Sequence, residues 1–143
     1  MTAARPWHIP VVGWLAVVWT ALGALDFTLM QLRVEPYLRA FTTERVAFFS
    51  SLPDWIDALW GIGVWAGLAG ALFLAVDIRR SAAILGLSAL AIVLAGIYLV
   101  FISSPTLQEA VGEEAFWILA VAVVVAILLW IYARWLHSAG AVS

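Results

Sequence analysis

Four long apolar stretches constrain this chain more than any other feature of its sequence. They run from about Pro10 to Leu32, Trp55 to Val76, Ser81 to Ile102 and Ala115 to Leu136. Each holds about 22 residues, or roughly 33 Å of helix, enough to cross a hydrocarbon core of about 30 Å. A membrane-spanning backbone must satisfy its own hydrogen bonds, and barrel strands would be shorter and alternate in polarity. The sequence therefore predicts an all-α integral membrane protein, a four-helix bundle that forms one domain over residues 1–143.

Composition supports this fold class and removes several classes of function. The 143 residues are 66% hydrophobic and 11% charged, too apolar for a small core to cover in water. The seven basic residues are scattered, which argues against nucleic acid as a partner. Cysteine is absent, and the two histidines, His8 and His137, lie near opposite ends of the chain. We therefore expect no metal site and no cofactor.

The charges between the apolar stretches predict an orientation. Four spans place both termini on one side of the membrane. On that side lie Arg5, Arg79, Arg80 and Arg134, and on the other lie Arg33, Arg39 and Arg45. This small excess, together with the N-terminal amine, predicts cytoplasmic termini under the positive-inside rule. The link between the first two spans then lies on the outer side.

That first link, residues 34–52, carries an apolar pattern of its own. Val34, Tyr37, Leu38, Phe41, Phe48 and Phe49 recur at spacings near three, four and seven. Such spacing is typical of an amphipathic helix that lies on the membrane surface or caps a bundle. Thr42 is a suitable N-cap for a second short helix, because its hydroxyl can accept a hydrogen bond from an unpaired amide. We expect a broken helical segment over residues 34–52, which we call the lid.

Asp26 is the most unusual residue of the first span. It lies six residues before Leu32, so roughly 9 Å below the outer boundary of the hydrocarbon. An unpaired carboxylate there is costly, and such residues are candidates for function. Its helix face also carries Trp19, Leu22, Gly23, Met30 and Arg33, whereas Gln31 points elsewhere. We expect the Arg33 side chain to bend back over Asp26, leaving open whether Asp26 serves a ligand or ion site or only a structural network.

Other spans bring polar and aromatic groups to the same depth. Asp57 and Trp60 lie in the first turns of the second span, and Tyr98 lies near the outer end of the third. Together with Tyr37 in the lid, they predict a polar, aromatic-lined cavity under the outer surface. The second span also carries a stripe formed by Gly63, Gly67 and Gly70, which permits close helix packing.

The residues around this cavity resemble a known pattern. It comprises Asp26, Gln31, Arg33, Glu35, Tyr37, the Phe41-Thr42 pair, Pro53, Trp55 and Trp60. The chain thereby resembles a family of small four-helix proteobacterial membrane proteins, some labelled sugar transporters, which are similar to DoxX-type proteins in size and topology. The resemblance covers the whole chain and is most specific from Asp26 to Trp60. It implies the bacterial inner membrane as location and brings no established activity.

Three functions fit these features. The first is a non-enzymatic membrane component: an accessory subunit of a larger complex, or a protein that binds a lipid or small amphiphile in the outer cavity. The second is a transporter working as a homo-oligomer, with Asp26 as substrate or coupling acid, although no inverted repeat accompanies it. The third is an enzyme in which Asp26 and Asp57 do acid-base work, but no nucleophile, metal set or cofactor motif accompanies them. We favour the first.

Overall fold

The protein is a bundle of four long helices with three short ones at one end, seen in a computed structural model that describes residues 5–140. The long helices are α1 (His8–Gln31), α4 (Asp54–Val76), α5 (Ser81–Ile97) and α7 (Glu113–Ser138). The short ones are α2 (Glu35–Leu38), α3 (Thr43–Ser50) and α6 (Leu107–Val111). A 3₁₀ turn, Ile78–Arg80, precedes α5, and a π-helical turn, Tyr98–Ile102, extends it. The described residues contain no strand, so the prediction of an all-α chain is confirmed.

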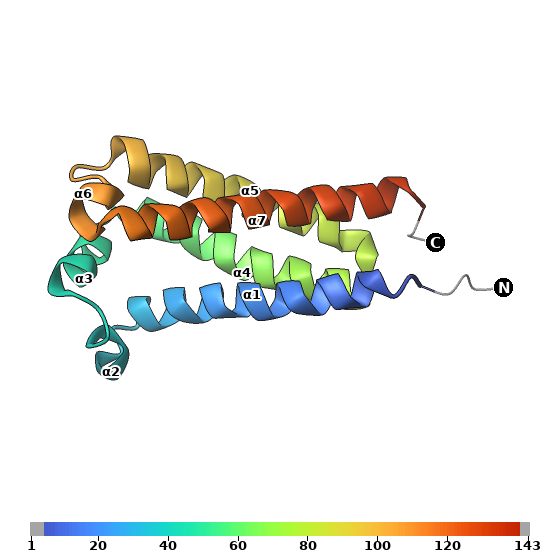
Figure 1. Ribbon diagram of the computed structural model, residues 1–143, viewed down its shortest axis with the longest axis horizontal. Helices are drawn as coiled ribbons and strands as arrows, with labels where there is room; N and C mark the ends of the chain where they lie inside the picture. The colour runs from blue at the N-terminus through green and yellow to red at the C-terminus, as the bar shows by residue number, and fades with distance from the viewer. Residues whose placement is uncertain (1–4, 141–143) are drawn as a thin grey trace.

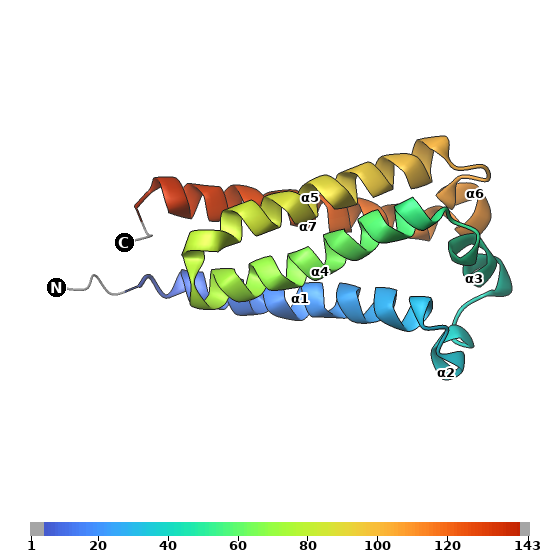
Figure 2. The same cartoon turned by 180° about the vertical axis from the view of Figure 1, so that it is seen from behind.

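Four helices are long and apolar enough to cross a membrane. They are α1, α4, α7 and α5, the last taken together with the turns on either side of it. Their ends differ from those of the four predicted stretches by at most two residues when the π-helical turn is counted with α5. Both described chain ends lie at one end of the bundle with the α4–α5 turn, and α2, α3 and α6 lie at the other (Figures 1 and 2). We call these the terminal end and the lid end.

The four long helices pack in a series rather than a closed ring. α1 packs along α4, α4 along α5, and α5 along α7. The glycine stripe of α4 explains the closeness of the central pair, because Gly63, Gly67 and Gly70 all face α5. A Cβ added at Gly63 would lie 2.6 Å from Ile92, and one at Gly70 2.7 Å from Leu85. Because α4 has no side chain at these positions, the Ile92 and Leu85 side chains of α5 pack directly on its backbone.

The terminal end is held by polar contacts and an apolar cluster. Arg5 donates from Nη1 to the Ala75 carbonyl at 2.8 Å and from Nη2 to the Leu74 carbonyl at 2.6 Å, satisfying carbonyls of the last turn of α4. His8 Nδ1 and the Tyr132 hydroxyl lie 2.8 Å apart and join α1 to α7. The buried cluster beside them is Ile9, Leu74, Ile78, Leu85, Ala133 and Leu136.

The lid folds as two short helices. Thr42 precedes α3 as its N-cap and accepts a hydrogen bond from the Arg45 amide, as the sequence predicted. Phe48, on the buried face of α3, packs with Leu107 of α6 and with Leu99 and Leu119. Helices α3 and α6 therefore share one apolar cluster over the end of the bundle.

Candidate functional site

A cavity of about 130 Å³ lies under α3 at the lid end. It is bounded by side chains from α1, α3, α4, α6 and α7 and from the π-helical turn. Its walls are mainly apolar: Phe27, Met30, Phe49, Leu52, Ile56, Trp60, Leu99, Leu107, Ala115, Ile118, Leu119 and Ala122. Only four of its lining residues are polar or charged: Asp26, Gln31, Arg45 and Asp57.

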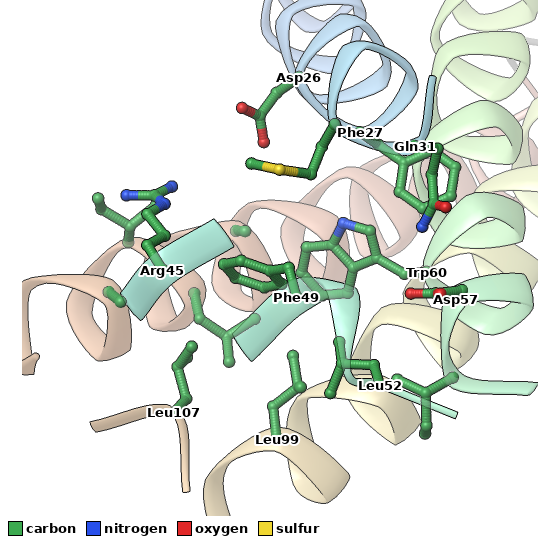
Figure 3. Close-up of a pocket in the computed structure, with 16 residues that line it drawn as sticks. Asp26, Phe27, Gln31, Arg45, Phe49, Leu52, Asp57, Trp60, Leu99 and Leu107 are labelled. Carbon is green, nitrogen blue, oxygen red and sulfur yellow. The ribbon is translucent and has the colours of Figure 1, made fainter. Parts of the chain in front are cut away.

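The polar groups lie on two sides of this cavity. Figure 3 shows Asp26 and Arg45 on one side, and Gln31 and Asp57 on the other, with the indole of Trp60 between. Asp26 and Gln31 come from the last two turns of α1, Asp57 and Trp60 from the first two turns of α4, and Arg45 from α3. The pairing of α1 with α4 therefore brings the two carboxylates to one cavity.

Asp26 is tied to the lid through Tyr37. The Tyr37 hydroxyl, on α2, donates a hydrogen bond to Asp26 Oδ1. Partial burial, and after it the bond to Asp26, raise the pKa of Tyr37 from 10.0 to about 12, so the phenol remains a donor at neutral pH. Asp26 Oδ2 accepts no hydrogen bond from residues 5–140, and Asp26 as a whole is exposed.

The expected Arg33–Asp26 contact is wrong. Helix α1 ends at Gln31, and Arg33 takes a left-handed backbone conformation with φ of 53°, which turns the chain away from the helix. Its side chain therefore no longer follows the face that holds Asp26. Arg33 Nη2 instead donates to Ser50 Oγ at 3.0 Å, joining the end of α1 to the end of α3.

Arg45, which was not among the predicted site residues, is the basic residue that lines the cavity. Its guanidinium carbon lies 4.5 Å from the centroid of the Phe41 ring and 5.9 Å from that of Phe49, within the range of cation–π attraction. Its Nε is buried and has no hydrogen-bond partner among the described residues. The sequence does contain a signal for this contact. Phe41 lies four residues before Arg45, and Phe48 and Phe49 lie three and four residues after it, spacings that bring side chains together on a helix.

Gln31 was expected to point away from the site, and it does not. It lines the cavity from the side of α1 that faces α4, where its carboxamide faces the Asp57 carboxylate (Figure 3). The prediction considered only the helix face that carries Asp26. Because α1 packs directly along α4, a second face of α1 also contributes to the site.

Tyr98 does not line the cavity, contrary to the prediction from the sequence. Its ring packs edge to face on Trp55, with centroids 5.1 Å apart, at the start of the π-helical turn. The next residue, Leu99, lines the cavity in its place. Of the seven predicted ligand or network residues, Asp26, Met30, Asp57 and Trp60 line the cavity, Tyr37 bonds Asp26, and Arg33 and Tyr98 lie outside.

A second cavity, of about 220 Å³, adjoins the first. Both are lined by Asp26, Trp60, Ile118 and Ala122. The second continues toward the terminal end between α1 and α7, past Trp19, Leu22 and Gly23, to Leu85 and Leu129. The predicted face of α1 is thus divided between the two cavities, with Met30 in the first, Trp19, Leu22 and Gly23 in the second, and Asp26 in both.

No protein-family model, curated protein or solved structure matches this chain. Within residues 5–140, no three His, Cys, Asp or Glu side chains come together as a metal ion would require. The chemistry of the site is therefore argued from its own residues: two carboxylates, a guanidinium and an amide around an apolar space.

Proposed function

We propose that this protein is a non-enzymatic membrane protein that binds a small amine-bearing amphiphile in the cavity beneath the lid. The observation that carries the proposal is the division of the lining into a charged part and an apolar part. The carboxylates, Arg45 and Gln31 line the first cavity, whereas the adjoining second cavity contributes almost only apolar surface beyond Asp26. Such a division suits a ligand with a charged head and an apolar tail.

Charge favours a cationic head. Asp26 and Asp57 carry two negative charges against the single positive charge of Arg45, and neither carboxylate forms an ion pair within residues 5–140. A carboxylate beside apolar walls gains most from a nearby cation. The indole of Trp60 adds an aromatic face to which an ammonium group is attracted. Because Asp26 borders both cavities, we assign the ammonium to Asp26.

Arg45 would refine this selectivity. Its buried Nε lacks an acceptor among the described residues, and a buried donor without a partner is costly. An acceptor oxygen close to the amine, as in an amino-alcohol or aminophosphate head group, would supply that partner. We therefore expect such heads to bind more tightly than a simple alkylammonium.

The buried cluster at the terminal end favours binding over transport. The second cavity stops at Leu85 and Leu129, against the buried cluster that includes Ile9 and Leu136. A transported substrate would need a polar path beyond this cluster, and the polar groups there, Arg5, His8 and Tyr132, already have partners.

We also propose that this is a multi-pass protein of the bacterial inner membrane, with cytoplasmic termini and the lid end on the outer side. The distribution of arginines between the two ends favours this orientation.

The test is binding of decylammonium to the purified full chain, reconstituted in uncharged nanodiscs and compared with decanoate and with a neutral decyl glycoside. We expect saturable binding of the amine alone. Asp26→Asn should weaken it at least tenfold, or about 1.4 kcal/mol, because the amide keeps an oxygen for Tyr37 but removes the charge. Asp57→Asn should weaken it less, since Asp57 lies on the opposite side of the cavity.

Asp54→Asn is the matched control, because Asp54 begins α4, the helix that also carries Asp57, and does not line the cavity. It should leave the affinity unchanged. Equal binding of decylammonium and decanoate, or equal losses for the Asp54 and Asp26 variants, would contradict a specific amine site.

A further inference from the structure

Helices α1 and α7 stand at the two ends of the packing series, and a groove separates them. Each packs along its own partner, α1 on α4 and α7 on α5. They join at the terminal end, through the His8–Tyr132 contact and the cluster that contains Ile9 and Leu136. Between that junction and the lid, the second cavity occupies the space between them.

The wall of this groove offers a charged partner at one end only. Near the lid end stands Asp26. Deeper, the Thr20 hydroxyl already donates to the Ala16 carbonyl at 2.7 Å, and the Ser88 hydroxyl donates to the Gly63 carbonyl at 2.6 Å. The remaining lining side chains are apolar, apart from the indole N–H groups of Trp19 and Trp60. An occupant of the groove must therefore be apolar along its length and charged, if at all, only beside Asp26.

The groove is also open along its side. Trp19 is 43% exposed, and Leu22 and Ile118 are each 61% exposed, although all three line the cavity. In a bilayer this opening would face hydrocarbon, because it lies between two helices long and apolar enough to span. From Asp26 to Trp19 the wall extends seven residues, or about 10 Å along the helix.

We propose that the groove between α1 and α7 holds the alkyl chain of the bound amphiphile, and that the chain enters sideways from the bilayer. The inference rests on the proposed function, in which the ammonium lies at Asp26. It names the ligand class more closely: a long-chain amine with a single chain in this groove. Charge complementarity at Asp26 and the apolar wall below it favour such a chain over a helix of a second copy, which would bring no cation to Asp26.

The decisive experiment maps the chain directly. A dodecylammonium probe with a photoreactive diazirine at the end of its chain is added to the full protein in nanodiscs, illuminated, and its adducts are located by mass spectrometry. We expect adducts on residues 19–23 of α1 and 122–129 of α7, suppressed by excess unlabelled dodecylammonium. Adducts confined to the lid, or spread evenly over the outward faces of the helices, would overturn the groove as the chain site. Cross-links between two copies of the protein through α1 and α7 would overturn it as well.

A matched pair of variants separates the groove from the head site. Val125 lines the groove, and its neighbour Val124 is 53% exposed and does not. Val125→Phe should remove the groove adducts and weaken dodecylammonium binding at least tenfold, whereas Val124→Phe should change neither. If Asp26→Asn weakens dodecylammonium binding while Val125→Phe does not, the proposed function stands and the groove assignment fails. If neither Asp26→Asn nor unlabelled amine affects labelling, both fail.

Discussion

The two ends of the bundle use polar side chains in opposite ways. At the terminal end, the Arg5 guanidinium binds two carbonyls of α4, and His8 meets Tyr132 across the gap between α1 and α7. At the lid end, Asp26, Asp57 and Arg45 line a cavity. Asp26 accepts a hydrogen bond from the Tyr37 hydroxyl, Asp57 faces the Gln31 carboxamide, and Arg45 Nε has no partner within residues 5–140. The first end closes the bundle, whereas at the second the charged groups line a cavity.

Because of this difference, substitutions at the two ends should affect stability and ligand binding to different degrees. Polar groups that have partners within the fold stabilise it, whereas a buried polar atom without a partner, such as Arg45 Nε, costs free energy unless a ligand completes it. Substitutions at the terminal end should therefore reduce stability with little effect on binding. At the lid end, a substitution that removes a charge but keeps the hydrogen-bonding atoms, as Asp26→Asn does, should weaken binding more than it reduces stability. The following predictions test this contrast, from the largest expected effect to the smallest.

Gly13→Ala should cause the largest loss of stability. A Cβ at Gly13 would lie 2.6 Å from the Ala75 Cα and 2.8 Å from its backbone nitrogen, so α1 and α4 would have to separate near the terminal end. Overpacking of this kind costs about 1–3 kcal/mol. The free energy of unfolding, measured by denaturation in mixed detergent micelles, checks the prediction.

The same substitution nearer the lid end is its control. At Gly23, the nearest atom to an added Cβ is Val64 Cγ1 at 3.9 Å, an ordinary contact. Gly23→Ala should be neutral, or should stabilise the helix by up to about 1 kcal/mol through propensity. Equal destabilisation by the two variants would show that α1 is as tightly packed near the lid end as near the terminal end, and the contrast would not hold.

Arg5→Ala should come next. It removes two hydrogen bonds from a charged donor to carbonyls at the end of α4 and should cost about 1–2 kcal/mol. Arg33→Ala removes one exposed hydrogen bond, to Ser50, and should cost about 0.5 kcal/mol. The same unfolding assay compares them. A larger loss for Arg33 than for Arg5 would mean that the lid, rather than the terminal end, holds the bundle together.

The four long helices could be predicted because each depends on a property of a continuous stretch of sequence. Hydropathy over about 20 residues is sufficient to place a spanning helix, and helical periodicity placed Trp19, Gly23, Asp26 and Met30 on one face. The N-cap at Thr42 was predictable for the same reason, since capping is local chemistry. The lining of the candidate cavity by Asp26, Met30, Asp57 and Trp60 followed from their depth in the first two long helices.

What could not be predicted depends on contacts between distant segments or on a single backbone dihedral. The left-handed conformation of Arg33 diverts its side chain to Ser50 and leaves Asp26 to Tyr37. Gln31 faces the cavity only because α4 lies beside it, which no periodicity within α1 reveals. The groove between α1 and α7 follows from the order in which the four long helices pack. No single stretch of the sequence specifies that order.

The smallest effect we expect is a change in the titration of Tyr37, which tests how the lid is attached. The pKa of Tyr37 is raised to about 12, first by burial and then by its bond to Asp26. Because the folded pKa is the higher one, the contact stabilises the fold fully below about pH 10, the ordinary pKa of tyrosine. That contribution is lost as the pH rises through about 12. Subtracting the phenolate absorbance of Tyr37→Phe from that of the unmodified protein isolates this one residue.

Asp26→Asn sharpens the same measurement. It removes the negative charge that opposes ionisation of Tyr37, so the pKa should fall toward 10. It should stay above 10 because burial, the largest single cause, remains. Asp57→Asn should leave the Tyr37 titration unchanged, since Asp57 is not among its causes. If the Asp26 variant titrates like the unmodified protein, the lid is not attached through this carboxylate. The fold of the lid end would then not depend on the charge of Asp26, whereas the fold of the terminal end depends on Arg5.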